Sequence, residues 1–261
     1  MDIIVFLKQV PGTSRVDIDE KTGTLKRQGV ESKMNPYDLY ALETALRIKA
    51  AHGGRVTALS MGPGQAEAIL REAFAMGADS AVLLSDPAFA GSDVLATSRA
   101  LSQAVMKLGG YDLIICGKQT TDGDTAQVGP ETAEFLNIPH ASNVTEIINV
   151  SDAIILKTDM GDSVQTIEMP FPCLIAVEKG VYTPRLPSYK LKLEAADRKI
   201  TVLKLADLFD NDPGNYGLDG SPTRVERIFP PEPSTEKIRI SGSGDEVAGL
   251  LYAKLKELKF I

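Results

Sequence analysis

Short apolar runs alternate with longer amphipathic stretches over the first 140 residues of the chain. The apolar runs cover residues 3–7, 56–61, 81–85 and 113–116, and each is rich in β-branched residues or leucine. Strands that are buried on both faces read as continuous apolar runs, so these four predict the centre of a parallel sheet. Their alternation with helical stretches predicts βα units and therefore an α/β fold.

The helical stretches carry start and stop signals. Asn35 stands before Pro36, which suits a first helical turn, and Gly53 follows the apolar positions, so one helix is expected between them with Asn35 as its cap. Three further helices are expected over residues 65–76, 92–108 and 131–136, the second of them capped by Ser92.

The pattern changes to consecutive strands after residue 140. Runs over residues 153–157, 164–169 and 173–177 predict an antiparallel meander that is joined to the parallel core. An alternating stretch over residues 16–27 predicts an exposed hairpin between the first strand and the first helix.

The last third of the chain contains less regular segments. Residues 178–199 are basic, contain two prolines and lack a clear period, so we expect a long surface loop. An amphipathic helix is expected over residues 245–260, packed either on its own domain or on a partner. We therefore expect an α/β domain over residues 1–208 and an extension over 209–261.

Composition excludes several classes of protein. The 261 residues are 43% hydrophobic and carry a formal net charge of -7, so a sizeable core is expected and a nucleic-acid or acidic-membrane surface is not. No apolar run approaches the ~20 residues of a membrane-spanning helix, and the first residues lack a secretory signal, so we expect a cytoplasmic protein. Cys116 and Cys173 lie in apolar runs as expected free thiols, and no motif indicates a metal site or a catalytic side chain.

The most informative segment, residues 116–130, leaves an apolar strand and leads into a helix. Gly117, Gly123 and Gly129 leave room for close backbone approach at the edge where open α/β sheets bind ligands. A second glycine turn, residues 61–64, leaves a neighbouring strand at the same edge. From the residues alone, a nucleotide site and an ordinary capped turn fit this segment equally well.

The charged residues of this segment have divided roles. Lys118 and the hydroxyl of Thr125 are placed to reach phosphate oxygens. Asp122 and Asp124 would repel phosphate and suit ribose hydroxyls or helix capping. Because no catalytic motif accompanies them, any chemistry is expected to come from a bound cofactor.

Several short motifs in consistent order resemble the electron-transfer flavoprotein beta (small) subunit, over residues 1 to about 200. They are Lys8-Gln9-Val10-Pro11, Met34-Asn35-Pro36-Tyr37-Asp38, Met61-Gly62-Pro63, Gly117-Lys118-Gln119, Asp124-Thr125-Ala126-Gln127, Gln165-Thr166-Ile167 and Pro172-Cys173-Leu174-Ile175-Ala176. The resemblance implies a mainly parallel sheet of adenine-nucleotide-binding, Rossmann-like topology, with an antiparallel extension and a C-terminal helix that packs on a larger alpha subunit.

The resemblance also implies a bound nucleotide. Housekeeping members hold AMP in this subunit, whereas electron-bifurcating members of anaerobic bacteria hold a second FAD. Residues 8–13 and 122–130 resemble the bifurcating type, so FAD is favoured and AMP is the alternative. The implied cofactor-binding residues are Phe6, Lys8, Val10, Asn35, Tyr37, Asp38, Met61, Gly117, Lys118, Gln119, Thr121, Asp122, Gly123, Asp124, Thr125, Ala126, Gln127 and Val128.

The bifurcating type implies that FAD in this subunit oxidises NADH. One electron then goes to ferredoxin or flavodoxin, and the other passes through the alpha-subunit FAD to a flavin-dependent dehydrogenase of the acyl-CoA or lactate type. Pro11, Gly12 and Thr13 are expected to border the NAD site, although many relatives carry Asp in place of Gly12.

The segment 177–199 corresponds in position to the family's dehydrogenase-docking loop, with Leu186 or Tyr189 as its apolar anchor. Many relatives end this loop in a dense lysine run, which Glu194 and Asp197 dilute here. A stand-alone nucleotide-hydrolysing or adenylating enzyme is the competing interpretation. Such an enzyme needs a Ser-Gly-Gly-type phosphate loop after its first strand, where this chain has Lys8-Gln9-Val10-Pro11.

Overall fold

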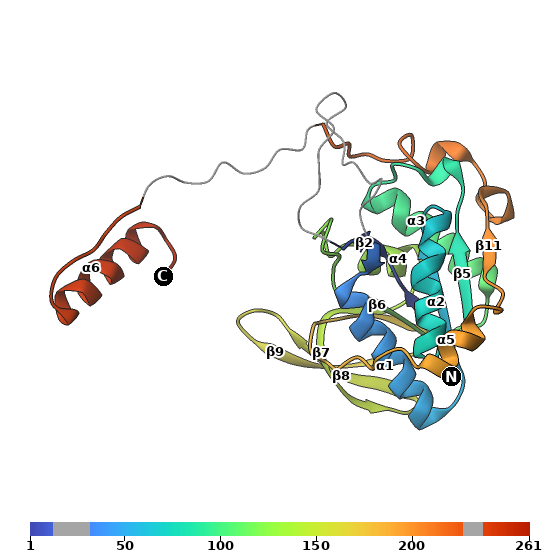
Figure 1. The fold of residues 1–261 in the computed structure, drawn as a ribbon, viewed down its shortest axis with the longest axis horizontal. Coiled ribbons are helices and arrows are strands. Elements are labelled where there is room, and N and C mark those ends of the chain that lie inside the picture. Colours follow the sequence, from blue (N-terminus) through green and yellow to red (C-terminus); the bar gives the residue numbers. More distant parts are fainter. Residues whose placement is uncertain (13–31, 227–236) are drawn as a thin grey trace. The chain divides into compact units, whose positions relative to one another are not determined.

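The computed structural model describes residues 1–12, 32–226 and 237–261 (Figure 1). The chain forms two compact units, Met1–Glu226 and Arg227–Ile261. We expected the division after residue 208, but residues 209–226 pack on the first unit, where Tyr216 is only 1% exposed. The hairpin expected over residues 16–27 lies outside the described residues.

A nine-stranded sheet crosses the first unit in the order β11-β5-β4-β1-β6-β10-β7-β8-β9. Neighbouring strands from β11 to β7 are parallel, and β7, β8 and β9 are antiparallel. The bounds are β1 (Asp2–Phe6), β4 (Arg55–Met61), β5 (Ser80–Leu84), β6 (Leu113–Gly117), β7 (His140–Val150), β8 (Ala153–Asp159), β9 (Val164–Pro170), β10 (Cys173–Val177) and β11 (Thr201–Leu203). A separate antiparallel pair joins β2 (Gln9–Pro11) to β3 (Ser32–Met34). The predicted α/β fold with a mainly parallel sheet is confirmed.

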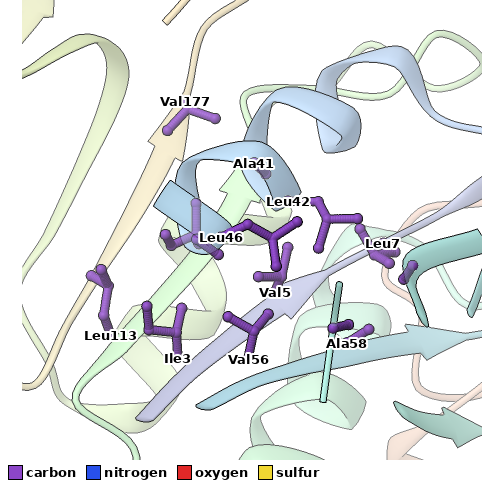
Figure 2. Close-up of a cluster of buried hydrophobic side chains, with 14 of the residues drawn as sticks. Ile3, Val5, Leu7, Ala41, Leu42, Leu46, Val56, Ala58, Leu113 and Val177 are labelled. Carbon is purple, nitrogen blue, oxygen red and sulfur yellow. The ribbon is translucent and has the colours of Figure 1, made fainter. Parts of the chain in front are cut away.

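Helices cover both faces of the parallel strands. Residues of α1, α2 and α5 share a buried cluster on one face, and residues of α3 and α4 share another on the opposite face. Figure 2 shows Leu42 and Leu46 of α1 beside Ile3 and Val5 of β1. The bounds are α1 (Pro36–His52), α2 (Glu67–Met76), α3 (Val94–Leu108), α4 (Val128–Leu136), α5 (Tyr189–Ala195) and α6 (Gly244–Glu257), with 3-10 turns η1 (Gly64–Ala66), η2 (Pro87–Phe89), η3 (Leu205–Asp207) and η4 (Pro213–Asn215).

Coverage on both faces explains why the strands read as apolar runs in the sequence. The free thiols of Cys116 and Cys173 are buried among them, as expected. None of the helices in the described part of the chain has the length and apolar character to cross a membrane.

The strand order creates a topological switch point beside β1. From β1 the chain moves outward to β4 and β5, and it then returns to β6 on the other side of β1. The connections after β1 and β6 therefore diverge at the carboxyl ends of these neighbouring strands. Open α/β sheets bind ligands in the crevice that this divergence leaves.

The position of β10 differs from the prediction. We expected residues 173–177 to close an antiparallel meander, but β10 lies between β6 and β7 and runs parallel to both, with Cys173 opposite Leu113. All five β10 residues are buried, as is typical of a strand inside a parallel sheet. The meander consists of β7, β8 and β9, and we did not predict β7 as a strand.

The two predicted helix caps have different outcomes: Asn35 is the N-cap residue of α1, as predicted, but without a side-chain bond, whereas Ser92 does not cap α3. The side chain of Asn35 makes no capping hydrogen bond to α1, and α3 is capped by Asp93, whose carboxylate accepts a hydrogen bond from the backbone N–H of Ala96 at 3.1 Å. The adjacent Ser92 hydroxyl instead donates to the carbonyl oxygen of Phe89 at 2.9 Å. The Asn35 amide donates to the Gln119 carbonyl oxygen at 2.9 Å, and the Ser92 hydroxyl also accepts from the N–H of Gly217 at 3.0 Å, so both side chains are committed to distant segments.

The segment 178–199 is not a loop throughout. It contains α5, whose first turn is capped by the Ser188 hydroxyl and whose Ala195 is buried against the core. A seven-residue helix is too short to give a clear helical period in the sequence. The parts before and after α5 are irregular, and the part before it contains Leu186.

Candidate nucleotide-binding site

A cavity of about 1070 Å³ opens at the carboxyl ends of β5, β4, β1 and β6. Small-molecule sites in proteins usually enclose ~300–1,000 Å³, so this cavity is slightly larger than that range. Its walls come from the turn after β4, the segment from Ser85 to Val94 after β5, and the segment from Gly117 to Gly129 after β6. The cavity therefore occupies the switch point that the strand order creates.

Asn35 links the start of α1 to the segment after β6. Its side chain is fully buried, its Nδ2 donates to the carbonyl oxygen of Gln119 at 2.9 Å, and its Oδ1 accepts from the backbone N–H of Thr121 at 3.3 Å. Two backbone groups of the loop are thus held by one rigid side chain. Asn35 shapes the cavity wall without lining the cavity.

Asp38 lies one helical turn further along α1 and faces the cavity. Its carboxylate accepts hydrogen bonds from Asn35 Nδ2 at 2.9 Å and from the backbone N–H of Lys8 at 2.7 Å. Burial raises the pKa of Asp38 to about 7, although these hydrogen bonds, one from the Gly117 backbone and the charge of Lys8 oppose the rise. Asp38 joins the ends of β1 and β6 to α1.

Gly117 is required by this close packing. A Cβ atom at this position would lie 2.6 Å from both Asp38 Oδ1 and Tyr37 Cβ. At Gly129 a Cβ atom would lie 2.7 Å from Cys116 Sγ. These two glycines therefore let α1 and α4 approach the end of β6, as expected for glycines at a ligand-binding edge.

Two lysines of the site are engaged in ion pairs. Lys8 Nζ lies 2.7 Å from Asp122 Oδ1 and 3.4 Å from Thr120 Oγ1, and its side chain is 45% exposed. Lys118 Nζ pairs with Glu178, which follows β10. Both charges are therefore compensated, that of Lys8 by Asp122 within the cavity lining and that of Lys118 by Glu178, which lies outside it.

The loop before α4 has an unusual backbone. Asp124 and Ala126 both have φ of 56°, in the left-handed region that non-glycine residues rarely adopt. Such conformations concentrate at ligand sites, where surrounding contacts hold them. Gln119 Nε2 donates to the Asp124 carboxylate and closes this loop on itself. The two left-handed residues and the bond between Gln119 and Asp124 together give the loop a defined shape at the rim of the cavity.

The first turn of α4 is directed at the same space. The N–H groups of Val128 and Gly129 have no acceptor within the helix, and the Gln127 side chain does not cap them. Pro130 has no N–H, and the N–H of Glu131 donates to the Gln127 carbonyl oxygen at 3.0 Å. Val128 and Gly129 both line the cavity. Open N–H groups and the helix dipole attract anions such as phosphate.

Apolar side chains form another wall. Phe6, Leu59 and Met61 come from β1 and β4, and Phe89 and Leu101 come from η2 and α3. Such a surface suits the flat ring system of a nucleotide base or a flavin. The cavity thus combines a polar, anion-attracting end with an apolar wall.

The structure brings most residues of the predicted site together. Pro11 and fourteen of the expected cofactor-binding residues line the cavity: Phe6, Lys8, Val10, Asp38, Met61, Gly117, Lys118, Gln119, Asp122, Gly123, Thr125, Ala126, Gln127 and Val128. Gly12, Asn35, Tyr37, Thr121 and Asp124 are not in the lining. Thr13 lies outside the described residues. Leu186 and Tyr189 are elsewhere on the first unit, with side chains that are 88% and 76% exposed.

Sequence reasoning missed the wall after β5. This wall contains Asp86, Phe89 and Asp93, and Val225 joins the lining from far along the chain. The predicted strand over residues 81–85 could have indicated Asp86, Phe89 and Asp93, because they follow its carboxyl end, which lies at the same edge of the sheet as the other site segments. Nothing in the sequence indicated Val225.

A mainly parallel sheet with a cavity at its switch point is the arrangement of α/β proteins that bind a ligand at the carboxyl ends of their strands. The family model described as "Electron transfer flavoprotein domain" matches residues 22–208. The chain is 47% identical to electron transfer flavoprotein subunit beta of Thermoanaerobacterium thermosaccharolyticum over 237 residues, 91% of this chain and 90% of that protein. It is 43% identical over 261 residues to the protein of the same name from Clostridium acetobutylicum, with 100% of both chains covered.

A third relative is the caffeyl-CoA reductase-Etf complex subunit CarD of Acetobacterium woodii. It is 43% identical over 263 aligned residues, with 100% of both chains covered. The chain belongs to the electron transfer flavoprotein family, among its beta subunits.

Proposed function

We propose that the cavity holds FAD and that the chain, bound to an electron transfer flavoprotein alpha subunit, oxidises NADH there and bifurcates the electrons. The observation that carries this proposal is a continuous cavity of about 1070 Å³, which extends from the segment after β6 to the wall after β5. FAD contains AMP as one of its halves, so AMP alone would leave much of this space unfilled. A dinucleotide fits the volume better.

The chain's own residues supply binding and orientation. The N–H groups at the start of α4 and the Lys8 ammonium are placed to hold phosphate oxygens. The apolar wall with Phe6 and Met61 would cover a flat ring and exclude water. Bound FAD would supply hydride acceptance from NADH and single-electron transfer, which no side chain of this site provides.

Partners complete the proposed function. The second unit contains α6, on which no residue is buried and Leu250 and Leu251 are 55% and 47% exposed. We propose that this face contacts the alpha subunit. The name of CarD refers to a complex of a CoA-ester reductase with such a flavoprotein, which supports a dehydrogenase as a further partner. Ferredoxin or flavodoxin is proposed as the other electron acceptor.

Two surface segments carry the remaining assignments. Pro11, which lines the cavity, and the adjacent Gly12 are proposed to border the NAD site. Leu186 and Tyr189, which are strongly exposed apolar side chains, are proposed as anchors for the dehydrogenase. Exposed large apolar side chains next to polar ones are typical of protein interaction sites.

Nucleotide content tests the proposal. The chain is co-expressed with its alpha subunit, and the nucleotides released from the purified complex are separated and counted. Two FAD and no AMP per heterodimer is the expected result. One FAD with one AMP would contradict the NADH-oxidising function and leave a housekeeping subunit.

Lys8→Met gives a second test with a matched control. The variant removes the cation at the cavity, so it should retain less nucleotide than the wild type. Lys157→Met removes a similar ion pair, Lys157 with Glu146 at 2.7 Å on β8 and β7, and should retain nucleotide normally. Equal retention by both variants would remove Lys8 from the site.

A further inference from the structure

The segment Gly217–Val225, called the strap below, lies against the wall that follows β5. It belongs to the first unit, and Val225 at its end is part of the cavity lining. The wall it touches supplies Ala90, Ser92 and Asp93 to the same lining. The strap therefore borders the cavity even though it is more than 100 residues away from the wall in the sequence.

Asp93 joins the strap to the wall. One carboxylate oxygen, Oδ1, caps α3 through the N–H of Ala96 at 3.1 Å. The other, Oδ2, accepts two hydrogen bonds from Thr223, at 2.9 Å from its backbone N–H and at 2.7 Å from its hydroxyl. The backbone N–H of Asp93 also donates to the Ser221 hydroxyl at 2.8 Å. Three of these four bonds hold the strap.

Other contacts fix the start of the strap. The N–H of Gly217 donates to the Ser92 hydroxyl at 3.0 Å, and a Cβ atom at Gly217 would lie 2.5 Å from the carbonyl oxygen of Ala88. Just before the strap, Tyr216 is buried with its ring edge-to-face against Phe89, at 5.4 Å between centroids. Phe89 also lines the cavity. The strap start is thus packed tightly, and the bonds to Asp93 secure the remainder.

We propose that the strap is a retaining wall of the nucleotide cavity and that Asp93 is the positioning residue that holds it closed. This inference rests on the cavity being the nucleotide site, but it holds for FAD and for AMP alike. Loss of the Asp93 bonds would let the second half of the strap leave the rim while Tyr216 stays in place. The nucleotide would then escape faster through the widened opening.

The test removes the strap's side of the contact and leaves Asp93 intact, so that α3 keeps its cap. The variant Ser221→Ala/Thr223→Val loses both strap hydroxyls. The control Ser163→Ala/Thr145→Val makes the same chemical changes in and next to the β7–β9 meander, where Ser163 bonds Asp162 and Thr145 bonds Lys157. Thr223→Ser keeps a hydroxyl and serves as the rescue variant.

The measurement is the release over time of nucleotide bound in excess of one FAD per heterodimer, in the co-expressed alpha–beta complex. The double variant loses two hydrogen bonds to Asp93 and one within the strap, from the Ser221 hydroxyl to the Gly217 carbonyl oxygen at 2.6 Å. The two bonds to Asp93 predict a rise in the dissociation rate constant of roughly five- to twentyfold. The control and Thr223→Ser should stay within about twofold of the wild type. If the double variant does not fold, Thr223→Val alone should show a rise of roughly three- to tenfold.

Three outcomes overturn the inference. The strap variant could release nucleotide at the wild-type rate, or the control variant could release it as fast as the strap variant does. The wild-type complex could also contain no nucleotide beyond one FAD. The identity of the released nucleotide separates this inference from the proposed function. Release of AMP would contradict the FAD proposal, whereas the strap is judged by the rate alone.

Discussion

The side-chain amide of Asn35 donates to the carbonyl oxygen of Gln119 at 2.9 Å and so ties the start of α1 to the segment that follows β6. The two residues are separated by 84 positions in the sequence. Because the Asn35 side chain is fully buried, its amide has no water that could replace this bond. Asn35 therefore acts on the cavity by shaping its wall.

Asn35→Ala should destabilise the protein and loosen the nucleotide site. The substitution leaves the Gln119 carbonyl oxygen and the Thr121 N–H without their partner, so the free energy of unfolding should fall by about 2–3 kcal/mol. Urea denaturation measures this loss, and nucleotide content should fall with it. Asn149→Ala, which removes an amide on the surface of β7, should change neither quantity.

Gly117→Ala should be far more damaging than the same change at Gly64. A Cβ atom at position 117 would overlap Asp38 and Tyr37 at 2.6 Å, whereas at Gly64 nothing lies within 4 Å. Overpacking of this kind costs about 1–3 kcal/mol or more, because the α1 backbone would have to move. Thermal unfolding of both variants measures this difference in stability. A Gly117→Ala protein as stable as Gly64→Ala would show that α1 can shift freely.

Asp38 should make stability depend on pH. Its pKa of about 7 is raised above the ordinary aspartate value of 3.8, so between these two pH values the folded state keeps a proton that the unfolded state has released. The contribution of this residue is therefore fully present below pH 4 and is lost as pH rises through 7, by up to about 1 kcal/mol per pH unit.

Asp38→Asn isolates that contribution. The difference in free energy of unfolding, wild type minus variant, should fall steadily from pH 5 to pH 7 and level off above pH 8. Urea denaturation of the nucleotide-free proteins at these pH values gives this difference. The contributions of most other titrating groups are the same in both proteins and therefore cancel. A difference that does not change with pH would show that Asp38 stays ionised in the folded protein.

The parallel core was predictable because it depends on local patterns. Strands β1, β4, β5 and β6 were found within a residue of their ends, since each is a buried apolar run. The cavity edge was found because glycine turns follow two of them. Both signals lie within a few consecutive residues, where sequence patterns are informative.

Other features depend on contacts between distant segments. The apolar run of β10 fitted either a meander or a central strand, and only its pairing with β6 decides between them. The burial of Asp38 and the bond between Asp93 and Thr223 likewise require two segments to meet. A polar residue in the sequence reads as a cap or a surface group until its distant partner is known.

Glu43 shows how the segment that carries Leu186 is held. The Glu43 side chain is only 3% exposed and accepts three hydrogen bonds from Arg185: from Nε at 2.7 Å, from Nη2 at 3.2 Å and from the backbone N–H at 3.1 Å. Burial tends to raise the pKa of Glu43, but the bonds from Arg185 and Arg47 outweigh it and the pKa is lowered. Three residues further on, the N–H of Ser188 donates to the Ala75 carbonyl oxygen at 2.8 Å. Leu186 is thus presented between two fixed points.

Glu43→Gln should free this segment and leave the nucleotide site intact. The neutral side chain weakens the ion pair between the buried Glu43 and the partly exposed Arg185, so the segment should open more often and trypsin should cleave after Arg185 about tenfold faster. Glu168→Gln on β9, an exposed strand residue, is the matched control and should be cleaved at the wild-type rate. Nucleotide content should be normal in both variants.

If the segment also presents Leu186 to a dehydrogenase, Glu43→Gln should raise the KM for that partner with little change in kcat, because only docking depends on the segment's orientation. Unchanged cleavage after Arg185 would show that packing of α5 on α2 holds the segment without Glu43.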